Sequence, residues 1–223
     1  MFTSIYKTII TTIIIFSSFL SFSLIASEKE INYLGRFSEG HLDGWNSKEF
    51  DGNTQYKIIN ITSLGKSVLQ AKSNNSASGL FKEQRIDLHK TPYLSWSWKT
   101  DKLYNNINES EKQGDDFVAR IYIVIDGGVF FWKTRALNYV WSSSFEKNHS
   151  WPNPYTSNAT MFAVESGEEN LGKWISYKRN VYQDLKNTLG KEVRYIDAIA
   201  VMTDSDNSGQ AATTYYGDIY FTP

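Results

Sequence analysis

Apolar and polar residues alternate along most of this chain, and that alternation limits its fold more than any other feature. In the stretch YLSWSWK, single polar residues separate Leu94, Trp96 and Trp98. The stretch TTYYGDIYF, at residues 213–221, alternates in the same way. Successive side chains of a β-strand point to opposite faces of a sheet, so a period of two predicts strands with one buried face.

The remaining patterns favour an all-β class. FVARIYIVI, at residues 117–125, is apolar on nearly both faces, as a central strand covered on both sides would be. A short helix is expected only near residues 182–189, where Gly190 would end it. Further strands are expected at residues 56–61, 68–71, 80–86, 129–133, 137–142, 160–164, 175–181 and 196–202. We predict an antiparallel β-sandwich or jelly roll.

The first 26 residues have the features of a secretory signal peptide. Lys7 precedes a long apolar stretch that is interrupted only by Ser and Thr and is followed by Ala26. We expect removal of residues 1–26, which leaves residues 27–223 as a single β-sandwich domain without a membrane span. Leu24 fits the cleavage rule poorly, so the exact cleavage point stays open. An uncleaved membrane anchor is the alternative, because the stretch is about long enough to span if its Thr and Ser residues are tolerated.

Composition limits the cellular compartment and the classes of binding partner that we expect. The 23 basic and 24 acidic residues nearly balance, which argues against a nucleic-acid partner, because a phosphate backbone requires a basic face. The chain has no cysteine, so disulfides cannot stabilise an exported fold. An exported protein that relies on its core alone fits a bacterial periplasm better than a eukaryotic secretory product. We therefore predict that the chain is exported to a bacterial periplasm, with the extracellular space as the second choice.

The stretch TDSDNSG, at residues 203–209, allows three interpretations. Its acids and Gly match the first half of an EF-hand loop, but position 12 is Tyr215, which cannot chelate as Glu does. A looser calcium site or ligand-binding loop, which would use Asp204, Asp206 and Asn207, stays open. The same residues are also turn formers that could simply join the last strands. Catalysis is the third possibility.

The stretch GDDFVAR contains an acid and a base that would share one face of a strand. Asp115 and Asp116 are adjacent and would point to opposite faces, so they cannot work as a paired acid and base. Asp116 has the same parity as Arg120, whose charge needs a carboxylate or a ligand on a central strand. Either the two form a buried structural pair, or Arg120 binds an anionic group or a sugar hydroxyl.

Two further groups of residues are typical of sugar recognition. Arg135, Asn138 and Tyr139 combine hydrogen-bonding groups for hydroxyls or uronates with an aromatic face for the sugar ring. They could equally lie at a packed edge. Trp151 lies in a long loop ahead of Pro152 and is a candidate for a binding rim, with packing in the core as its alternative.

Several motifs together resemble the bacterial domain-of-unknown-function family 3047, from about residue 37 to residue 221. They are GDDFVARIYIV, TRALNYVWSS, WPNPYTSNATMFAVESG, RNVYQDLKNTLG and IDAIAVMTDSDNSGQAATTYYGDIYF. RFSEGHLDGW and YYGDIYF are similar to the ends of galactose-binding-like jelly rolls, the fold of many carbohydrate-binding modules. That second resemblance implies a structural Ca²⁺ at Asp218, with Ser38 or Glu39 as its early partner.

These observations predict an exported, non-catalytic binding module of the bacterial envelope for a glycan or polysaccharide. A structural or protein-interaction domain of the envelope is one alternative. Another is a jelly-roll polysaccharide lyase or hydrolase, in which Arg120 or Arg135 would neutralise a uronate and Tyr139 would move a proton. Catalytic motifs do not decide the question, because the sequence has no Cys, no G-x-S-x-G and no H-E-x-x-H.

Overall fold

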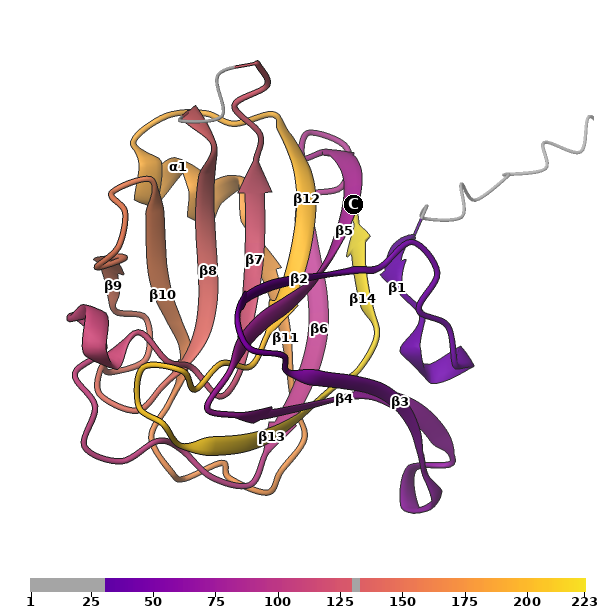
Figure 1. Ribbon diagram of the computed structural model, residues 1–223. Helices are drawn as coiled ribbons and strands as arrows, with labels where there is room; N and C mark the ends of the chain where they lie inside the picture. The colour runs from indigo at the N-terminus through magenta and orange to yellow at the C-terminus, as the bar shows by residue number, and fades with distance from the viewer. Residues whose placement is uncertain (1–30, 130–132) are drawn as a thin grey trace, which may run out of the picture.

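The computed structural model describes residues 31–129 and 133–223, which form two β-sheets packed face to face (Figure 1). The strands are β1 Asn32–Gly35, β2 Asn46–Asp51, β3 Gln55–Ile61, β4 Lys66–Asn74, β5 Ala77–Asp87, β6 Tyr93–Thr100, β7 Arg120–Ile125, β8 Arg135–Ser142, β9 Ser150–Pro152, β10 Ala159–Ser166, β11 Ile175–Asn180, β12 Tyr195–Met202, β13 Ala211–Tyr216 and β14 Ile219–Thr222. The helices are α1 Val181–Leu189 and the 3-10 turns η1 Phe37–Glu39, η2 Thr62–Leu64 and η3 Lys112–Gly114. The predicted all-β sandwich or jelly roll is confirmed.

The first sheet has the strand order β1-β14-β6-β13-β4-β3, with β11 on the other edge of β6. The second sheet has the order β2-β5-β12-β7-β8-β10-β9. All the paired strands of the described residues are antiparallel except β8 and β10, which run parallel. β7 lies at the centre of the second sheet, as its apolar sequence predicts.

The stretch 213–221, predicted as one strand, is divided into β13 and β14 because both pair with the same edge of β6. The break falls at Gly217, whose backbone N–H donates to the carbonyl of Ser97. A Cβ at Gly217 would lie 2.2 Å from Oγ of Ser97, so a larger residue here would force the Ser97 hydroxyl to move.

Alternating side chains from both sheets meet in one apolar core. Leu94, Trp96 and Trp98 of β6 are all at most 2% exposed, which confirms the predicted alternation. The Trp96 ring stacks on Tyr139 of β8, with the ring centroids 5.3 Å apart and the planes inclined by 12°. Each such ring removes roughly 150–250 Å² of largely apolar surface from water, which makes these contacts a major source of stability.

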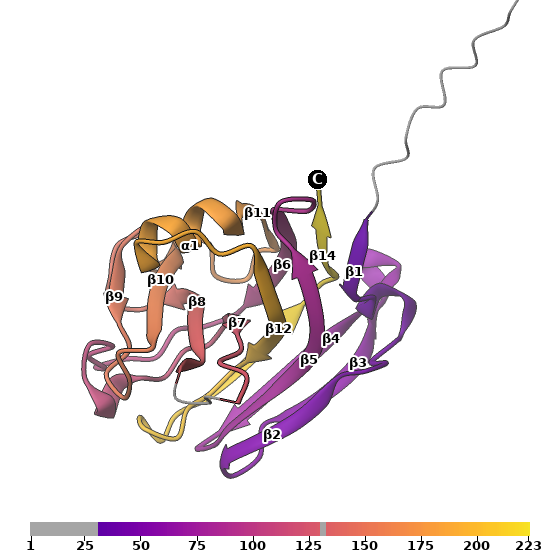
Figure 2. The same ribbon diagram turned by 90° about the horizontal axis from the view of Figure 1, so that it is seen from above.

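The predicted short helix is confirmed as α1, which packs beside β6 and β11 on one side of the sandwich (Figure 2). The Asn180 side chain accepts a hydrogen bond from the backbone of Gln183 at its start. Gly190 ends it in the left-handed conformation at φ +67°. No helix in residues 31–129 and 133–223 combines the length and apolar character needed to cross a membrane.

The segment between β7 and β8, residues 126–134, includes the expected strand at 129–133. Val129 lies in a turn, while residues 130–132 lie outside the described residues. Residues 101–114, which follow β6, bury Leu103, Tyr104 and Glu109 and are therefore part of the packed structure.

A second, smaller apolar cluster covers part of the outer face of the second sheet. It consists of Phe117, Val140, Trp151, Met161 and Ala163, with Phe145 packed against it. Because the connection between β8 and β10 contributes to it, this half of the outer face is closed. The outward faces of β7, β12 and β5, together with Asn138 of β8 and Ala159 of β10, carry the open surface described next.

Candidate functional site

A pocket of about 400 Å³ lies on the outer face of the second sheet. Tyr122 of β7 and Asn138 of β8 face it, because their neighbours Ile121 and Leu137 lie in the core between the sheets. The polar lining consists of Asp51, Asp115, Arg120, Tyr122, Asn138, Asn153, Tyr155, Thr156, Asp204, Asp206 and Asn207. Five residues predicted to bind a ligand thus line one pocket: Arg120, Asn138, Asp204, Asp206 and Asn207.

Arg120 is the centre of the polar network and is only 4% exposed. Its guanidinium lies 3.3 Å from Oδ2 of Asp204 and 3.4 Å from Oδ1 of Asp115. It also donates a hydrogen bond of 2.6 Å to the Tyr122 hydroxyl. Burial alone would lower the pKa of Arg120, but Asp204, Tyr122 and Asp115 raise it above its usual value. Arg120 is therefore buried and positively charged, and the neighbouring carboxylates of Asp204 and Asp115 balance its charge.

Arg120 pairs with Asp115 and Asp204, and not with Asp116 as the strand parity suggested. The parity argument is wrong here because residues 115–119 are irregular and β7 begins only at Arg120. The carboxylate of Asp116 instead accepts hydrogen bonds from the backbone N–H groups of Asn207, at 3.2 Å, and Ser208, at 2.5 Å. The stretch TDSDNSG is thus a turn that Asp116 holds from a segment about ninety residues earlier.

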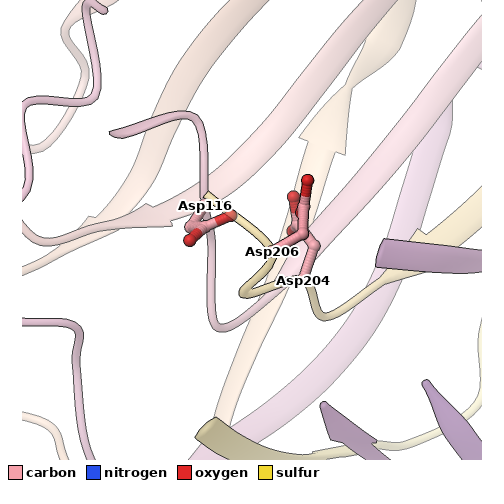
Figure 3. A group of neighbouring side chains, drawn as sticks. All are labelled: Asp116, Asp204 and Asp206. Carbon is pink, nitrogen blue, oxygen red and sulfur yellow. The ribbon is translucent and has the colours of Figure 1, made fainter. Parts of the chain in front are cut away.

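Three carboxylates lie close together where this turn meets the start of β7 (Figure 3). One oxygen each from Asp116, Asp204 and Asp206 lies within 4.8 Å of the others. Burial raises the pKa of Asp204 well above its usual value against the opposing effect of Arg120. Burial, followed by the charge of Asp116, also raises the pKa of Asp206. Asp206 is the most accessible of the three.

Two exposed aromatic rings line the pocket. Phe50 of the edge strand β2 is 63% exposed, and Tyr155 in the loop before β10 is 54% exposed. The Tyr155 hydroxyl accepts a hydrogen bond of 3.2 Å from Asn207 and donates one of 3.2 Å to the Lys112 carbonyl. Sequence reasoning missed both rings. Only the position of Tyr155, next to Pro154 in the loop that contains Trp151, offered a signal.

A second depression, of about 580 Å³, adjoins the first. The two share Phe50, Tyr122 and Met202, and the second continues along the outward faces of β5, β7 and β12. Its floor is mainly apolar, with Val124 and small residues of β12. The outer face therefore offers an elongated groove rather than an isolated hole.

Four of the predicted ligand-binding residues do not line either depression: Asp116, whose carboxylate holds the turn at residues 203–209, and Arg135, Tyr139 and Trp151. Tyr139 is fully buried in the core and donates a hydrogen bond of 2.6 Å to Asp184, since it has the parity of the core-facing residues of β8. Trp151 is 6% exposed and packs against Phe145, so it anchors the loop instead of forming a rim. Arg135 begins β8 at the end remote from the polar network.

The residues predicted to hold calcium form an internal contact. Both carboxylate oxygens of Asp218 accept hydrogen bonds from Ser38, at 2.8 Å from its backbone nitrogen and 2.5 Å from its hydroxyl. Glu39 is directed to Arg36, at 3.2 Å. Ser38 is thus the early partner of Asp218, as one of the two expected alternatives has it, and the calcium itself stays a prediction.

Comparison with known proteins gives a family and several distant structures. The sequence model of a family described as "Protein of unknown function (DUF3047)" matches residues 43–220, in agreement with the resemblance noted above. No curated protein matches the chain. The family 11 carbohydrate-binding module of cellulosomal cellulase Lic26A-Cel5E of Clostridium thermocellum is similar at TM-score 0.48 and 13% identity, over 87% of this chain and 95% of that one.

Two other solved structures are similar at the same distant level. The family 30 carbohydrate-binding module of cellulosomal cellulase Cel9D-Cel44B of Clostridium thermocellum has TM-score 0.44 and 12% identity, over 80% of this chain and 91% of that one. The xyloglucanase domain of NopAA from Sinorhizobium fredii has TM-score 0.45 and 7% identity, over 82% of this chain and 96% of that one.

Proposed function

The chain belongs to the DUF3047 family, whose function is unknown, and we propose that it is a non-catalytic binding module for a neutral glycan. The observation that carries this proposal is the pairing of two exposed rings, Phe50 and Tyr155, with the polar groups of one pocket. Aromatic faces pack against the C–H faces of sugars, and planar side chains bind the hydroxyls.

The polar groups of the pocket match hydroxyls in kind. Asp206, Asn207 and Asn153 are partly exposed in the lining and offer both acceptors and donors. Beneath them, Nε of Arg120 and Oδ1 of Asn138 are buried without hydrogen-bond partners. A buried polar atom without a partner costs free energy, and a hydroxyl, which both donates and accepts, can supply either kind of bond.

The charge of the groove favours a neutral ligand over a uronate. The basic residues that line the two depressions are Arg120, which is already paired, and Lys48. The acids are Asp51, Asp115, Asp204, Asp206, Glu83, Asp126 and Asp197. An anionic glycan would meet repulsion there. The lyase alternative has no support in this site, because Tyr139 lies in the core.

The elongated groove suits a chain of sugars. The volumes of its two parts, about 400 and 580 Å³, each fall in the size range of ordinary ligand sites. Because the parts share Phe50, Tyr122 and Met202, neighbouring sugar units could occupy both.

We also propose that the module is exported to the bacterial envelope. Support comes from the sequence, in which Lys7 precedes an apolar stretch ending near Ala26, and from the lack of cysteine. Residues 1–30 lie outside the described residues. The proposal is tested by expressing the protein in a bacterium, fractionating the cells and sequencing its N-terminus. Recovery of the protein from the cytoplasm with residues 1–26 still attached would contradict the proposal.

The glycan proposal is tested by titrating the protein with neutral and uronate-containing oligosaccharides in a calorimeter. Neutral oligosaccharides should bind, and Phe50→Ala and Tyr155→Ala should each weaken binding by roughly tenfold or more, since a stacked ring contributes about 1.5 kcal/mol or more. Leu64→Ala, which truncates another exposed apolar residue outside the pocket, is the matched control. Preference for uronates, unchanged affinity in both ring variants, or release of products would contradict the proposal.

A further inference from the structure

The cluster of Asp116, Asp204 and Asp206 has chemistry that glycan binding does not explain. Two segments distant in sequence bring the three carboxylates together, with one oxygen of each within 4.8 Å of the others (Figure 3). Asp116 and Asp204 are at most 3% exposed. Charges of one sign at this separation and depth repel strongly unless a positive charge lies among them.

The positive charge of the protein does not balance this cluster. Arg120 pairs with Asp204 and with Asp115, so one guanidinium serves two carboxylates. The ion pairs found among residues 31–129 and 133–223 do not reach Asp116 or Asp206. Asp115, Asp116, Asp204 and Asp206 together therefore outnumber Arg120 by three charges when all are ionised.

The hydroxyl of Tyr104 is an independent indication of a bound group. Tyr104 is 3% exposed, and its hydroxyl has no hydrogen-bond partner. Burial raises the pKa of Tyr104, and the charges of Asp204 and Asp116 raise it further, so the hydroxyl lies within electrostatic range of two of the three carboxylates. The Ser205 hydroxyl lies near enough to lower this pKa, but it shares a hydrogen bond of 2.6 Å with Ser73 and makes none of normal geometry with Tyr104. A buried hydroxyl without a hydrogen-bond partner, within range of carboxylates that it does not hydrogen-bond, calls for a further group that accepts from it.

We propose that Asp116, Asp204 and Asp206 bind a hard divalent cation, Ca²⁺, beside the pocket. Carboxylate oxygens are the ligands this ion prefers, and it commonly keeps water among its six to eight ligands. Such a water would accept a hydrogen bond from the Tyr104 hydroxyl. The N–H groups of Asn207 and Ser208 fix the Asp116 carboxylate, which preorganises the turn that carries Asp206.

This site differs from the one that the resemblance to galactose-binding-like domains implied. That resemblance pointed to Asp218, whose two oxygens both bind Ser38. The cation proposal does not depend on glycan binding, because the experiment that tests it uses no sugar.

The protein is stripped with EDTA, exchanged into metal-free buffer and titrated with CaCl₂ in a calorimeter, with thermal unfolding followed in parallel. We expect one binding event and a rise in Tm of roughly 5 °C at about 100 times the dissociation constant. Asp206→Asn should weaken binding by tenfold or more and remove the rise. Asp43→Asn, which changes an exposed acid outside the cluster, should behave as the wild type.

The effect of Asp206→Asn on the unfolding temperature should differ between Ca²⁺ and EDTA, and this difference distinguishes a metal site from a merely structural role. In EDTA, Asp206→Asn should unfold at the same temperature as the wild type or higher, because it removes a repelling charge. Tyr104→Phe should fold and bind Ca²⁺ several-fold more weakly. The proposal is overturned if the wild type shows neither heat nor a Tm shift at millimolar Ca²⁺, if Asp206→Asn binds as the wild type does, or if only Asp218→Asn abolishes binding.

Discussion

The guanidinium of Arg120 lies 3.3 Å from the carboxylate of Asp204, and both side chains are 4% exposed. A buried ion pair of this kind need not add to stability, but removal of one partner leaves the other charged and without compensation. In this protein the penalty is larger in principle, because Asp115 depends on the same guanidinium.

Replacement of Arg120 by Met should therefore lower the free energy of unfolding by about 3–5 kcal/mol. Chemical denaturation monitored by Trp fluorescence measures the change. Lys186→Met, which breaks the exposed pair between Lys186 and Glu192 at 2.9 Å, is the control and should give no resolvable loss. Equal losses in the two variants would show that Arg120 does not neutralise buried acids.

The sequence predicts the scaffold of this site better than its contacts. Alternation correctly assigns Leu94, Trp96 and Trp98 to the buried face, because the residues on the buried face of a strand are mostly apolar. The same alternation places Tyr139 opposite Asn138, so the core position of Tyr139 could have been derived once β8 was known to face the core with Leu137.

The parts that could not be derived are long-range or irregular. Asp116 holds the backbone of Asn207 across 91 positions, and no local pattern encodes such a contact. The pairing of Arg120 with Asp115 depends on an irregular segment before β7, to which strand parity does not apply. Phe50 belongs to an edge strand whose residues are all exposed, and it reaches the pocket only because β2 pairs with β5.

Tyr139 should matter for stability and not for ligand binding. Its hydroxyl donates a 2.6 Å hydrogen bond to Asp184, so Tyr139→Phe should lower the free energy of unfolding by about 1–2 kcal/mol. Glycan affinity, measured by calorimetry, should stay unchanged. A fall in glycan affinity without a fall in the free energy of unfolding would mean that Tyr139 belongs to the binding site.

Glu109 should make stability depend on pH. It is fully buried, and burial raises its pKa from 4.5 to about 7, although hydrogen bonds from Ser142 and Ser143 oppose the shift. The folded state then holds its proton more tightly than the unfolded state does. Stability from this group is complete below pH 4.5 and is lost as the pH rises through about 7.

Comparison of the wild type with Glu109→Gln isolates this contribution, because other acids titrate in both proteins. Relative to the variant, the wild type should lose on the order of 3 kcal/mol of unfolding free energy between these pH values. Urea denaturation from pH 4 to pH 8 measures the difference. A difference that does not change with pH would mean that Glu109 titrates normally in the fold.

Asp218 should stabilise the fold through Ser38 whether or not calcium is present. Its carboxylate accepts two hydrogen bonds that tie the turn after β1 to the segment before β14. Asp218→Ala leaves the Ser38 donors without this acceptor and should cost about 2–3 kcal/mol, since hydrogen bonds to charged groups are the stronger ones. Thermal and urea unfolding in EDTA should show the full loss, and added Ca²⁺ should raise Tm equally in the variant and the wild type. If instead the variant matched the wild type in EDTA and differed from it only in Ca²⁺, Asp218 would be the metal ligand and the hydrogen bonds to Ser38 would be secondary.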